Sequence, residues 1–327
     1  MRKKVLYVVH RYAPFPGGSE NYVRNMAEET LHRGHEVWVL AGEHKGDLNG
    51  VRVTKNPFIL LKKWDLIVVH GGDLPVQKNP IVRLTLESAK RLKSPMLLML
   101  IIPSDSRIYQ RATRAVKYVG CSTTEDWELV ERENLLPKSV QIRHSIDEKV
   151  SIGMPGFRAK YGIETKYMFL SCGGYWPNKA MRELVSLFDR VDREDITLVL
   201  TGYDNRYNLM PEESKFVKPF MIDDRNDVIS AILEADLYVM HSHREGFGLV
   251  LLESMLNKTP WAARNLAGAK LMNKFGFAYD TDEQLLDYMK TFSGAPQKQI
   301  EDAYIYVTSN HLVQNTVDDI LQLTLTS

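Results

Sequence analysis

The sequence has only two cysteines in 327 residues, Cys121 and Cys172, and both lie within apolar, strand-like segments. They lack the paired spacing of zinc sites and cannot form a disulfide framework, so they favour a reducing compartment. No apolar run approaches the roughly 20 residues that a membrane-spanning helix needs. The basic start of the chain is followed by about five apolar residues, fewer than the 7–15 of a secretion signal. We therefore expect a cytoplasmic globular protein.

The sequence also lacks a strong excess of either charge, because 42 Lys and Arg nearly balance 41 Asp and Glu. The balance is uneven along the chain: residues 1–150 carry 24 basic and 17 acidic residues, a net charge of +7, and residues 151–327 carry 18 and 24, a net charge of −6. Basic residues gather from Arg83 to Lys117, including Arg107, Arg111 and Arg114. Such a cluster suits anionic lipid headgroups, an anionic acceptor or nucleic acid, and it is equally typical of two solvated helix faces. Because the aromatic–basic interleaving of strand-binding proteins is absent, we favour peripheral association with an anionic membrane over nucleic acid.

Short apolar segments alternate with amphipathic ones along the whole sequence. The expected strands cover 5–9, 36–41, 66–70, 96–102, 115–121, 140–143, 167–172, 196–201 and 235–240, and the expected helices cover 20–33, 81–93, 124–133, 179–190, 228–234, 249–256 and 308–323. This alternation predicts an α/β fold of βαβ units, with parallel sheets covered by helices on both faces. The length suggests two doubly wound, Rossmann-like domains, 1–150 and 151–327, which we expect to face each other across a cleft. The last helix, about 308–323, is expected to pack back on the first domain.

The most informative segment joins an expected strand, 235–240, to an expected helix through a glycine turn. It places Glu245 in the turn and Glu253 eight positions later, with Gly246, Phe247, Gly248 and Leu249 between them. Glycines let the backbone approach a ligand closely, and unpaired N–H groups at a helix start suit phosphate. The two carboxylates are then placed to bind the hydroxyls of a nucleotide sugar. The alternative is an ordinary strand–turn–helix corner with two solvated glutamates, because Gly-x-Gly after a strand is a weak pattern.

Two further glycine turns precede expected helices at comparable places in the two domains. Gly17 and Gly18 lead into the first helix, where their amides suit phosphate or the acceptor. Gly173 opens a loop that ends in Lys179, an ammonium well placed to neutralise a diphosphate. The alternatives are that the glycines only form turns before helices and that Lys179 is an ordinary surface lysine.

Several segments in order along the chain resemble the family-4 retaining glycosyltransferases of the GT-B fold. They are His10–Glu20, Gly34–Val37, Trp64–His70, Gln141–Asp147, Gly173–Lys179 and Glu245–Met255. The spacing of Glu245 and Glu253 matches the two-glutamate motif of that family closely, and the segments span nearly the whole chain. The resemblance implies a hexosyltransferase that uses a UDP- or GDP-sugar, without a metal or other cofactor, and retains the anomeric configuration.

The resemblance also implies roles for single residues. Lys179 is expected to stabilise the diphosphate, Glu253 to bind the ribose and Glu245 to bind the donor sugar, so that Lys179 and Glu245 are the candidate catalytic residues. The amides of 246–249 and Gly173 are expected to line the phosphates, with Gly17 and Gly18 contributing from the first domain. His10, His70 and Asp105, which follow strands, are candidates for contact with a glycan or lipid-linked acceptor. The histidines 70, 144, 241 and 243 show no spacing typical of a metal site.

Three departures from the family pattern leave a second function open. Gly174 stands where the family has an arginine, and we consider Arg206 and Arg244 as its substitutes. Asp105 and Ser104 stand where many members have a histidine, and residues 257–260 replace the usual Gly-x-Pro. The alternative is therefore a weak or inactive homologue that binds a sugar nucleotide or a partner transferase. The sequence does not identify the donor base, the sugar, the linkage, the acceptor or the oligomeric state.

Overall fold

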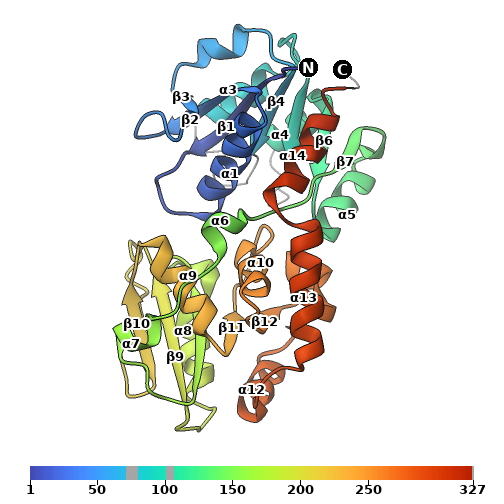
Figure 1. The fold of residues 1–327 in the computed structure, drawn as a ribbon. Coiled ribbons are helices and arrows are strands. Elements are labelled where there is room, and N and C mark those ends of the chain that lie inside the picture. The colour runs from blue at the N-terminus through green and yellow to red at the C-terminus, as the bar shows by residue number, and fades with distance from the viewer. Residues whose placement is uncertain (71–79, 101–106, 326–327) are drawn as a thin grey trace. The chain divides into compact units, whose positions relative to one another are not determined.

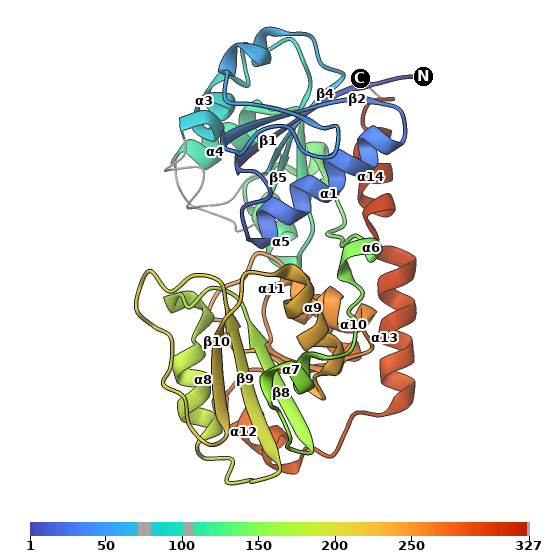
Figure 2. The same ribbon diagram turned by 60° about the vertical axis from the view of Figure 1, so that its left-hand side comes forward.

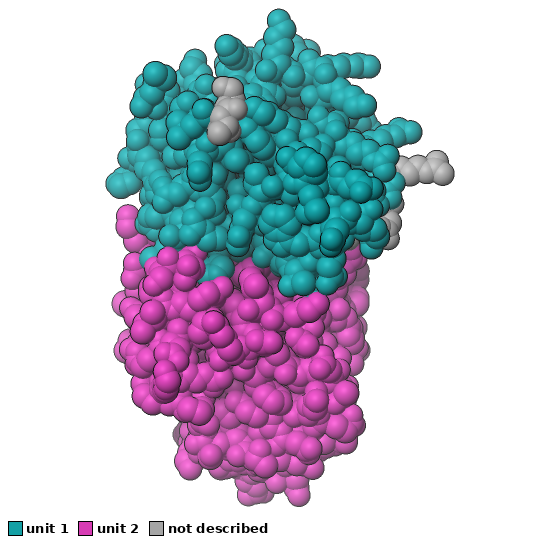
Figure 3. All heavy atoms as spheres, turned by 90° about the vertical axis from the view of Figure 1, so that its right-hand side faces the viewer, with its two compact units in different colours: residues 1–146, 311–327 teal, residues 147–310 magenta. Residues whose placement is uncertain are grey.

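The computed structural model describes residues 1–70, 80–100 and 107–325, and within them the chain forms two compact units. Unit 1 consists of residues 1–146 and 311–327, and unit 2 of residues 147–310; Figure 3 colours them separately. The junction thus lies between Ile146 and Asp147, four residues before the predicted boundary at 150. Residues 311–327, which the sequence analysis counted with the second domain, belong to unit 1.

In its described part, unit 1 is built on a parallel sheet of seven strands in the order β3-β2-β1-β4-β5-β6-β7 (Figure 1). The strands are β1 Lys4–Arg11, β2 Glu36–Glu43, β3 Arg52–Thr54, β4 Leu66–His70, β5 Met96–Met99, β6 Tyr118–Cys121 and β7 Ser139–Gln141. The helices are α1 Gly18–His32, α3 Pro80–Ser88, α4 Arg107–Ala115, α5 Thr124–Arg132 and α14 Val313–Gln322, with 3-10 turns η1 Pro57–Leu61 and η2 Leu136–Lys138. The strand order reverses between β1 and β4, where doubly wound sheets bind ligands at the carboxyl ends of the strands.

Unit 2 has a parallel sheet of six strands in the order β10-β9-β8-β11-β12-β13. These are β8 Tyr167–Cys172, β9 Ile196–Gly202, β10 Val217–Met221, β11 Leu237–Met240, β12 Trp261–Arg264 and β13 Phe277–Tyr279. The helical segments are α6 Glu148–Ser151, α7 Phe157–Tyr161, η3 Pro177–Lys179, α8 Met181–Phe188, α9 Arg225–Glu234, α10 Leu249–Leu256, α11 Ala267–Leu271, η4 Asn273–Phe275, α12 Asp282–Thr291 and α13 Gln297–Asn310. Figure 2 shows α8 on one side of β10, β9 and β8, and α9 and α10 on the other. The strand order reverses between β8 and β11, which places their carboxyl ends at the switch point of this sheet.

The central strands of both sheets are buried on both faces. Leu6, Val8 and Val69 lie in the core of unit 1, and Phe169 and Val239 lie in that of unit 2. Nearly continuous runs of apolar and β-branched residues are what a parallel sheet covered by helices requires. This is why the short apolar segments of the sequence indicate strands.

The predicted helix 308–323 is two helices, because the backbone breaks between α13 and α14. Ile146 donates its N–H to the carbonyl of His311 (3.0 Å), and its own carbonyl accepts the N–H of Val313 (2.9 Å). Backbone groups that would continue a helix are thus bound to Ile146 instead. The two points at which the chain leaves and re-enters unit 1 therefore lie side by side.

The last helix, α14, packs against α1 and is fixed to the end of the first segment of unit 1. Asp319 accepts hydrogen bonds from the side chain of Arg143 (Nε to Oδ2, 2.9 Å), and Thr316 donates its hydroxyl to the carbonyl of Arg143 (2.6 Å). Unit 1 is therefore completed by the C-terminal segment.

Candidate functional site

The loop between β11 and α10 carries the two glutamates that the sequence analysis singled out. Glu245 lies in the loop as expected, and Gly248, in the left-handed region (φ 88°), forms the N-cap of α10. Because α10 begins at Leu249, Glu253 is in its second turn. Glu253 is 5% exposed, so the reading of two solvated glutamates does not describe it.

Lys179 forms an ion pair with Glu245 at the carboxyl ends of β8 and β11. The distance from Lys179 Nζ to Glu245 Oε1 is 2.6 Å, and Ser242 donates its hydroxyl to the same oxygen, also at 2.6 Å. Gly173 makes room for this lysine, since a Cβ there would lie 3.3 Å from Lys179 Cε. The structure thus brings together the two residues that the sequence analysis named as catalytic candidates.

Glu253 forms a second ion pair, with Arg225 at the start of α9, which the sequence analysis did not predict. One guanidinium nitrogen lies close to Glu253 Oε1 and the other is 3.4 Å from Oε2. Burial opposes the charge of Arg225, yet the adjacent carboxylate raises the pKa of the guanidinium. The arginine is held as the permanently charged partner of a buried acid.

Two buried side chains lie near the ion pairs, Cys172 at the end of β8 and Tyr238 of β11, and the Cys172 Sγ is 3.8 Å from the Tyr238 hydroxyl oxygen. Burial, with a further contribution from Glu253, raises the pKa of Cys172 to about 12. Burial and then the charges of Cys172 and Glu245 raise the pKa of Tyr238 well above its ordinary value. Both side chains therefore stay protonated near neutral pH.

The arginine that the family has at position 174 has no room in this loop. A Cβ at Gly174 would lie 2.4 Å from the Trp176 ring, which therefore occupies the space of a larger side chain. Arg206 is committed elsewhere, because its Nε donates to Asp204 on the same loop (2.6 Å). Arg225 places a further cation beside Glu253.

In unit 1, Gly17 precedes α1 and a buried carboxylate lies against it. A Cβ at Gly17 would be 2.2 Å from Glu20 Oε2, and the Glu20 side chain is 4% exposed. Arg11 Nε donates to Glu20 Oε1 (2.7 Å), and His10 Nε2 lies 3.4 Å from the same atom. Burial alone would raise the pKa of Glu20, but hydrogen bonding to His10 and the charge of Arg11 lower it. A buried carboxylate held by Arg11 and His10 therefore lies beside Gly17.

The acceptor candidates His10 and His70 lie at the carboxyl ends of the adjacent strands β1 and β4. His70 is 5% exposed, and its ring makes an edge contact with Tyr22, which also contacts His144. Burial lowers the pKa of His70 to about 4, so it is neutral at pH 7. Asp105 and Ser104 lie outside the described residues.

Of the other histidines named in the sequence analysis, His241 packs in the interior of unit 2 and His243 is exposed. His241 is buried, its Nδ1 is 2.7 Å from the hydroxyl of Tyr279, and burial lowers its pKa to about 4. Among residues 1–70, 80–100 and 107–325, no group of His, Cys, Asp and Glu side chains is arranged to hold a metal ion. In the same part of the chain, no helix is long and apolar enough to cross a membrane.

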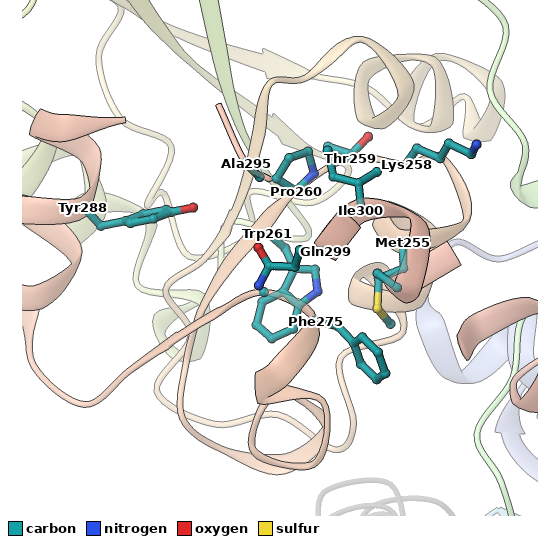
Figure 4. A pocket seen from close by; sticks show the side chains of 12 residues that line it. Met255, Lys258, Thr259, Pro260, Trp261, Phe275, Tyr288, Ala295, Gln299 and Ile300 are labelled. Carbon is teal, nitrogen blue, oxygen red and sulfur yellow. The ribbon is translucent and has the colours of Figure 1, made fainter. Parts of the chain in front are cut away.

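Figure 4 shows a small hollow in unit 2. Its lining includes Met255 at the end of α10, Trp261 at the start of β12, and Phe275 and Gln299. It therefore opens beside the amino end of β12, whereas the ion pairs lie at the carboxyl ends of β8 and β11. We assign it to the packing of unit 2.

The basic stretch Arg83–Lys117 is partly paired in its described portion. Arg83 pairs with Glu87 (2.9 Å) and Arg114 with Glu133 (3.3 Å), whereas Lys90, Arg91 and Lys93 form an exposed group after α3. The exposed positive charge in the described part of this stretch lies both between α3 and β5 and around α4, where Arg111 and Lys117 are also exposed.

One known family model matches the part of the chain that contains this site. Residues 154–283 match the family model described as "Glycosyl transferases group 1". This segment contains Gly173, Lys179, Arg225, Glu245 and Glu253, and the match indicates a glycosyltransferase domain. A search of curated proteins gives no match.

Solved structures resemble the whole chain at low sequence identity. Anabaena HepE in complex with UDP-glucose has a TM-score of 0.78 at 17% identity, covering 100% of both chains. A glycosyltransferase from Rickettsia africae has a TM-score of 0.75 at 16% identity and covers 99% of this chain and 98% of its own. WaaG, a glycosyltransferase of lipopolysaccharide biosynthesis, has a TM-score of 0.68 at 18% identity, covering 95% of this chain and 97% of its own. The chain has the GT-B fold, and its residues 154–283 match the group 1 glycosyl transferases.

Proposed function

We propose that the protein transfers a hexose from a UDP- or GDP-sugar to an acceptor, with retention of the anomeric configuration and without a metal ion. The observation that carries this proposal is the pair of ion pairs, Lys179–Glu245 and Arg225–Glu253, at the switch point of unit 2. Doubly wound sheets bind nucleotides at this position. The match of residues 154–283 to the glycosyl transferases supports the same assignment.

In this proposal each of the four charged side chains has a separate role in binding the donor. Lys179 binds the diphosphate, exchanging part of its contact with Glu245 for phosphate oxygens, and Glu245 turns to the hydroxyls of the donor sugar. Glu253 accepts the ribose hydroxyls while Arg225 keeps it in place. Gly173 and the backbone of 246–249 approach the phosphates, and Gly17 and Gly18 contribute backbone contacts.

The chemistry requires stabilisation of the leaving group more than protein acid–base catalysis. The bond between the anomeric carbon and the phosphate oxygen breaks, and the acceptor oxygen forms a bond on the same face of the sugar. The departing phosphate takes the acceptor's proton, as the resemblance to the retaining family implies. Fixed positive charge at the phosphate stabilises the charge that develops there. Lys179 supplies this charge, so no metal ion is needed in the proposed reaction.

The acceptor is proposed to be a glycan, most simply one linked to a lipid. His10 and His70, on adjacent strands of unit 1, and Asp105 are the candidates for contact with it. The neutral His70 suits hydrogen bonding to a hydroxyl better than pairing with an anion. Anabaena HepE in complex with UDP and glucose is a structural relative that holds both a nucleotide and a sugar, which supports a UDP-sugar as the first donor to test.

Gly174 favours a second candidate function, a homologue that binds a sugar nucleotide or a partner transferase without turnover. The Trp176 ring excludes the family's arginine from this loop, so Lys179 lacks that neighbour. Arg225 favours an active enzyme, because it supplies positive charge beside Glu253 at the proposed donor site.

One experiment separates these possibilities. The purified protein is screened by thermal shift against UDP- and GDP-sugars, and donors that bind are incubated with a mixed glycolipid extract, with and without EDTA. Release of free UDP or GDP that depends on the extract and persists in EDTA supports the transferase, and NMR of the product anomer tests retention. Donor binding without nucleotide release supports the inactive homologue, and the absence of any nucleotide binding contradicts both.

A further inference from the structure

Two large apolar side chains of unit 1 stand exposed on the single turn η1. Phe58 is 72% exposed and Leu61 is 76% exposed, whereas Ile59 and Leu60 between them are buried. In a 3-10 turn, side chains three positions apart eclipse one another. Phe58 and Leu61 therefore stand side by side and point away from the core.

The turn that carries them is firmly held. The indole of Trp64 is buried and donates to the carbonyl of Ile59 (3.0 Å). The side chain of Asn56 accepts the N–H of Phe58 (3.0 Å), and the N–H of Trp64 is bound by Ser94 Oγ (2.8 Å). The exposure of Phe58 and Leu61 is therefore a built feature of the surface.

Positive charge surrounds these two side chains. Arg52 and Lys62 lie over the ring of Trp38, at 5.3 and 5.1 Å from its centroid, and Lys55 and Lys63 are exposed on either side of η1. No acidic residue occurs from Val51 to Trp64.

Two acids of the neighbouring elements are paired with bases: Glu36 of β2 with Lys4 (3.6 Å) and Glu87 of α3 with Arg83. Asp65 and Asp47 accept backbone N–H groups, of Lys4 and Val53, and keep their negative charge. The basic residues on and beside η1 therefore outnumber the acids there.

The basic surface continues from η1 onto the loop after α3. The bond between Trp64 and Ser94 places Lys63 and Lys93 on neighbouring loops at the amino ends of β4 and β5, and α3 packs against η1. Figure 2 shows η1, in blue, beside α3 at the same end of unit 1. We call this surface the η1 tip: Arg52, Lys55, Phe58, Leu61, Lys62, Lys63, Lys90, Arg91 and Lys93.

We propose that the η1 tip binds an anionic lipid bilayer, with Phe58 and Leu61 inserted at the headgroup boundary. Apolar side chains within a ring of long basic ones fit this boundary, because the apolar ends enter the acyl region while the ammonium groups reach the headgroups. A protein partner fits less well, since two apolar side chains provide a small part of the about 800 Å² per partner that stable interfaces bury. The proposal is independent of the donor site, and it extends the expected membrane contact of the stretch Arg83–Lys117 onto η1.

Co-sedimentation of the full chain with vesicles tests the proposal. We expect binding to phosphatidylcholine vesicles that contain phosphatidylglycerol, weak binding to phosphatidylcholine alone, and loss of binding as salt rises. The double variants F58S/L61S and K62E/K63E should each bind at least about tenfold more weakly. Leu136→Ser is the matched control, because Leu136 is an exposed apolar residue of unit 1 (48%) outside the tip, and it should bind like wild type.

Three results would overturn the inference. They are wild-type vesicle binding by F58S/L61S, equal binding to neutral and anionic vesicles, and no vesicle binding at all. Circular dichroism and the affinity for UDP and GDP serve as separate readouts for each variant. Retained nucleotide affinity with lost vesicle binding supports the η1 tip even if transferase activity is never found.

Discussion

Replacing Lys179 with alanine tests the electrostatics of the proposed donor site most directly. The substitution removes the ammonium that the proposal places on the diphosphate and leaves Glu245, 11% exposed in its side chain, without its 2.6 Å partner. Ser242 still donates its hydroxyl to Oε1 of this carboxylate. The variant site therefore loses the attraction between Lys179 and the diphosphate, and the unpaired Glu245 carboxylate now repels the diphosphate.

The expected size of the effect has two parts. A hydrogen bond to a charged group contributes about 1.5–3 kcal/mol, which corresponds to a roughly ten- to hundredfold loss of affinity. Repulsion between the unpaired Glu245 carboxylate and the diphosphate adds on the order of 1 kcal/mol. The double variant K179A/E245Q removes this repulsion and should bind several-fold more tightly than Lys179→Ala alone.

Isothermal titration with UDP and GDP measures these affinities without requiring a known sugar or acceptor. Lys258→Ala is the control, because Lys258 forms a comparable pair with Glu301 (3.0 Å) on the surface of unit 2. Wild-type affinity of Lys179→Ala for both nucleotides would refute the site. Identical affinities of Lys179→Ala and K179A/E245Q would refute the role given to Glu245.

Three further predictions concern stability. Arg225→Gln leaves the buried Glu253 unpaired and should lower the free energy of unfolding by about 1–3 kcal/mol in urea titrations, and an unchanged midpoint would show that the pair contributes nothing. Gly17→Ala places a Cβ against Glu20 at a φ of 147° and should cost about 1–3 kcal/mol in thermal denaturation, so a wild-type melting temperature would contradict the packing described. Burial lowers the pKa of His70 to about 4, so as pH falls this side chain is protonated in the unfolded chain before it is protonated in the folded protein. The neutral His70 therefore contributes fully to the free energy of unfolding above about pH 6.5. That contribution is lost as pH falls towards 4, by at most about 3 kcal/mol. His70→Gln should flatten this acid slope, and an unaltered pH dependence of unfolding would exclude His70 as its source.

The sequence predicted the parallel architecture well because burial on both faces leaves a direct trace in composition. Segments such as Val5–Val9 and Leu66–His70 consist almost wholly of apolar and β-branched residues, which a covered parallel strand requires. The turn before α10 was equally predictable, because glycine at 248 marks the left-handed position between the strand and the start of the helix. The positions of Glu245 and Lys179 at neighbouring strand ends follow from that architecture.

Arg225 was not predictable, since its role depends on a partner 28 positions later along the chain. Nothing in its local pattern distinguishes it from a solvated helix residue. Trp176 is similar: the sequence shows that the family's arginine is missing at Gly174, and only the packing shows that the indole fills its place. The break between α13 and α14 was missed for the same reason, because it depends on backbone bonds to the distant Ile146.

The return of α14 to unit 1 also determines the order in which the protein can mature on the ribosome. Unit 2 is continuous in sequence, from Asp147 to Asn310, so all its strands emerge before the chain reaches residue 311. Unit 1, although synthesised first, keeps the α14-binding face of α1 bare until Thr316 and Asp319 have left the exit tunnel. Unit 1 is thus synthesised first but is the last unit that can complete its fold. A chain truncated before α14 would expose that face of α1 to chaperones or to other nascent chains.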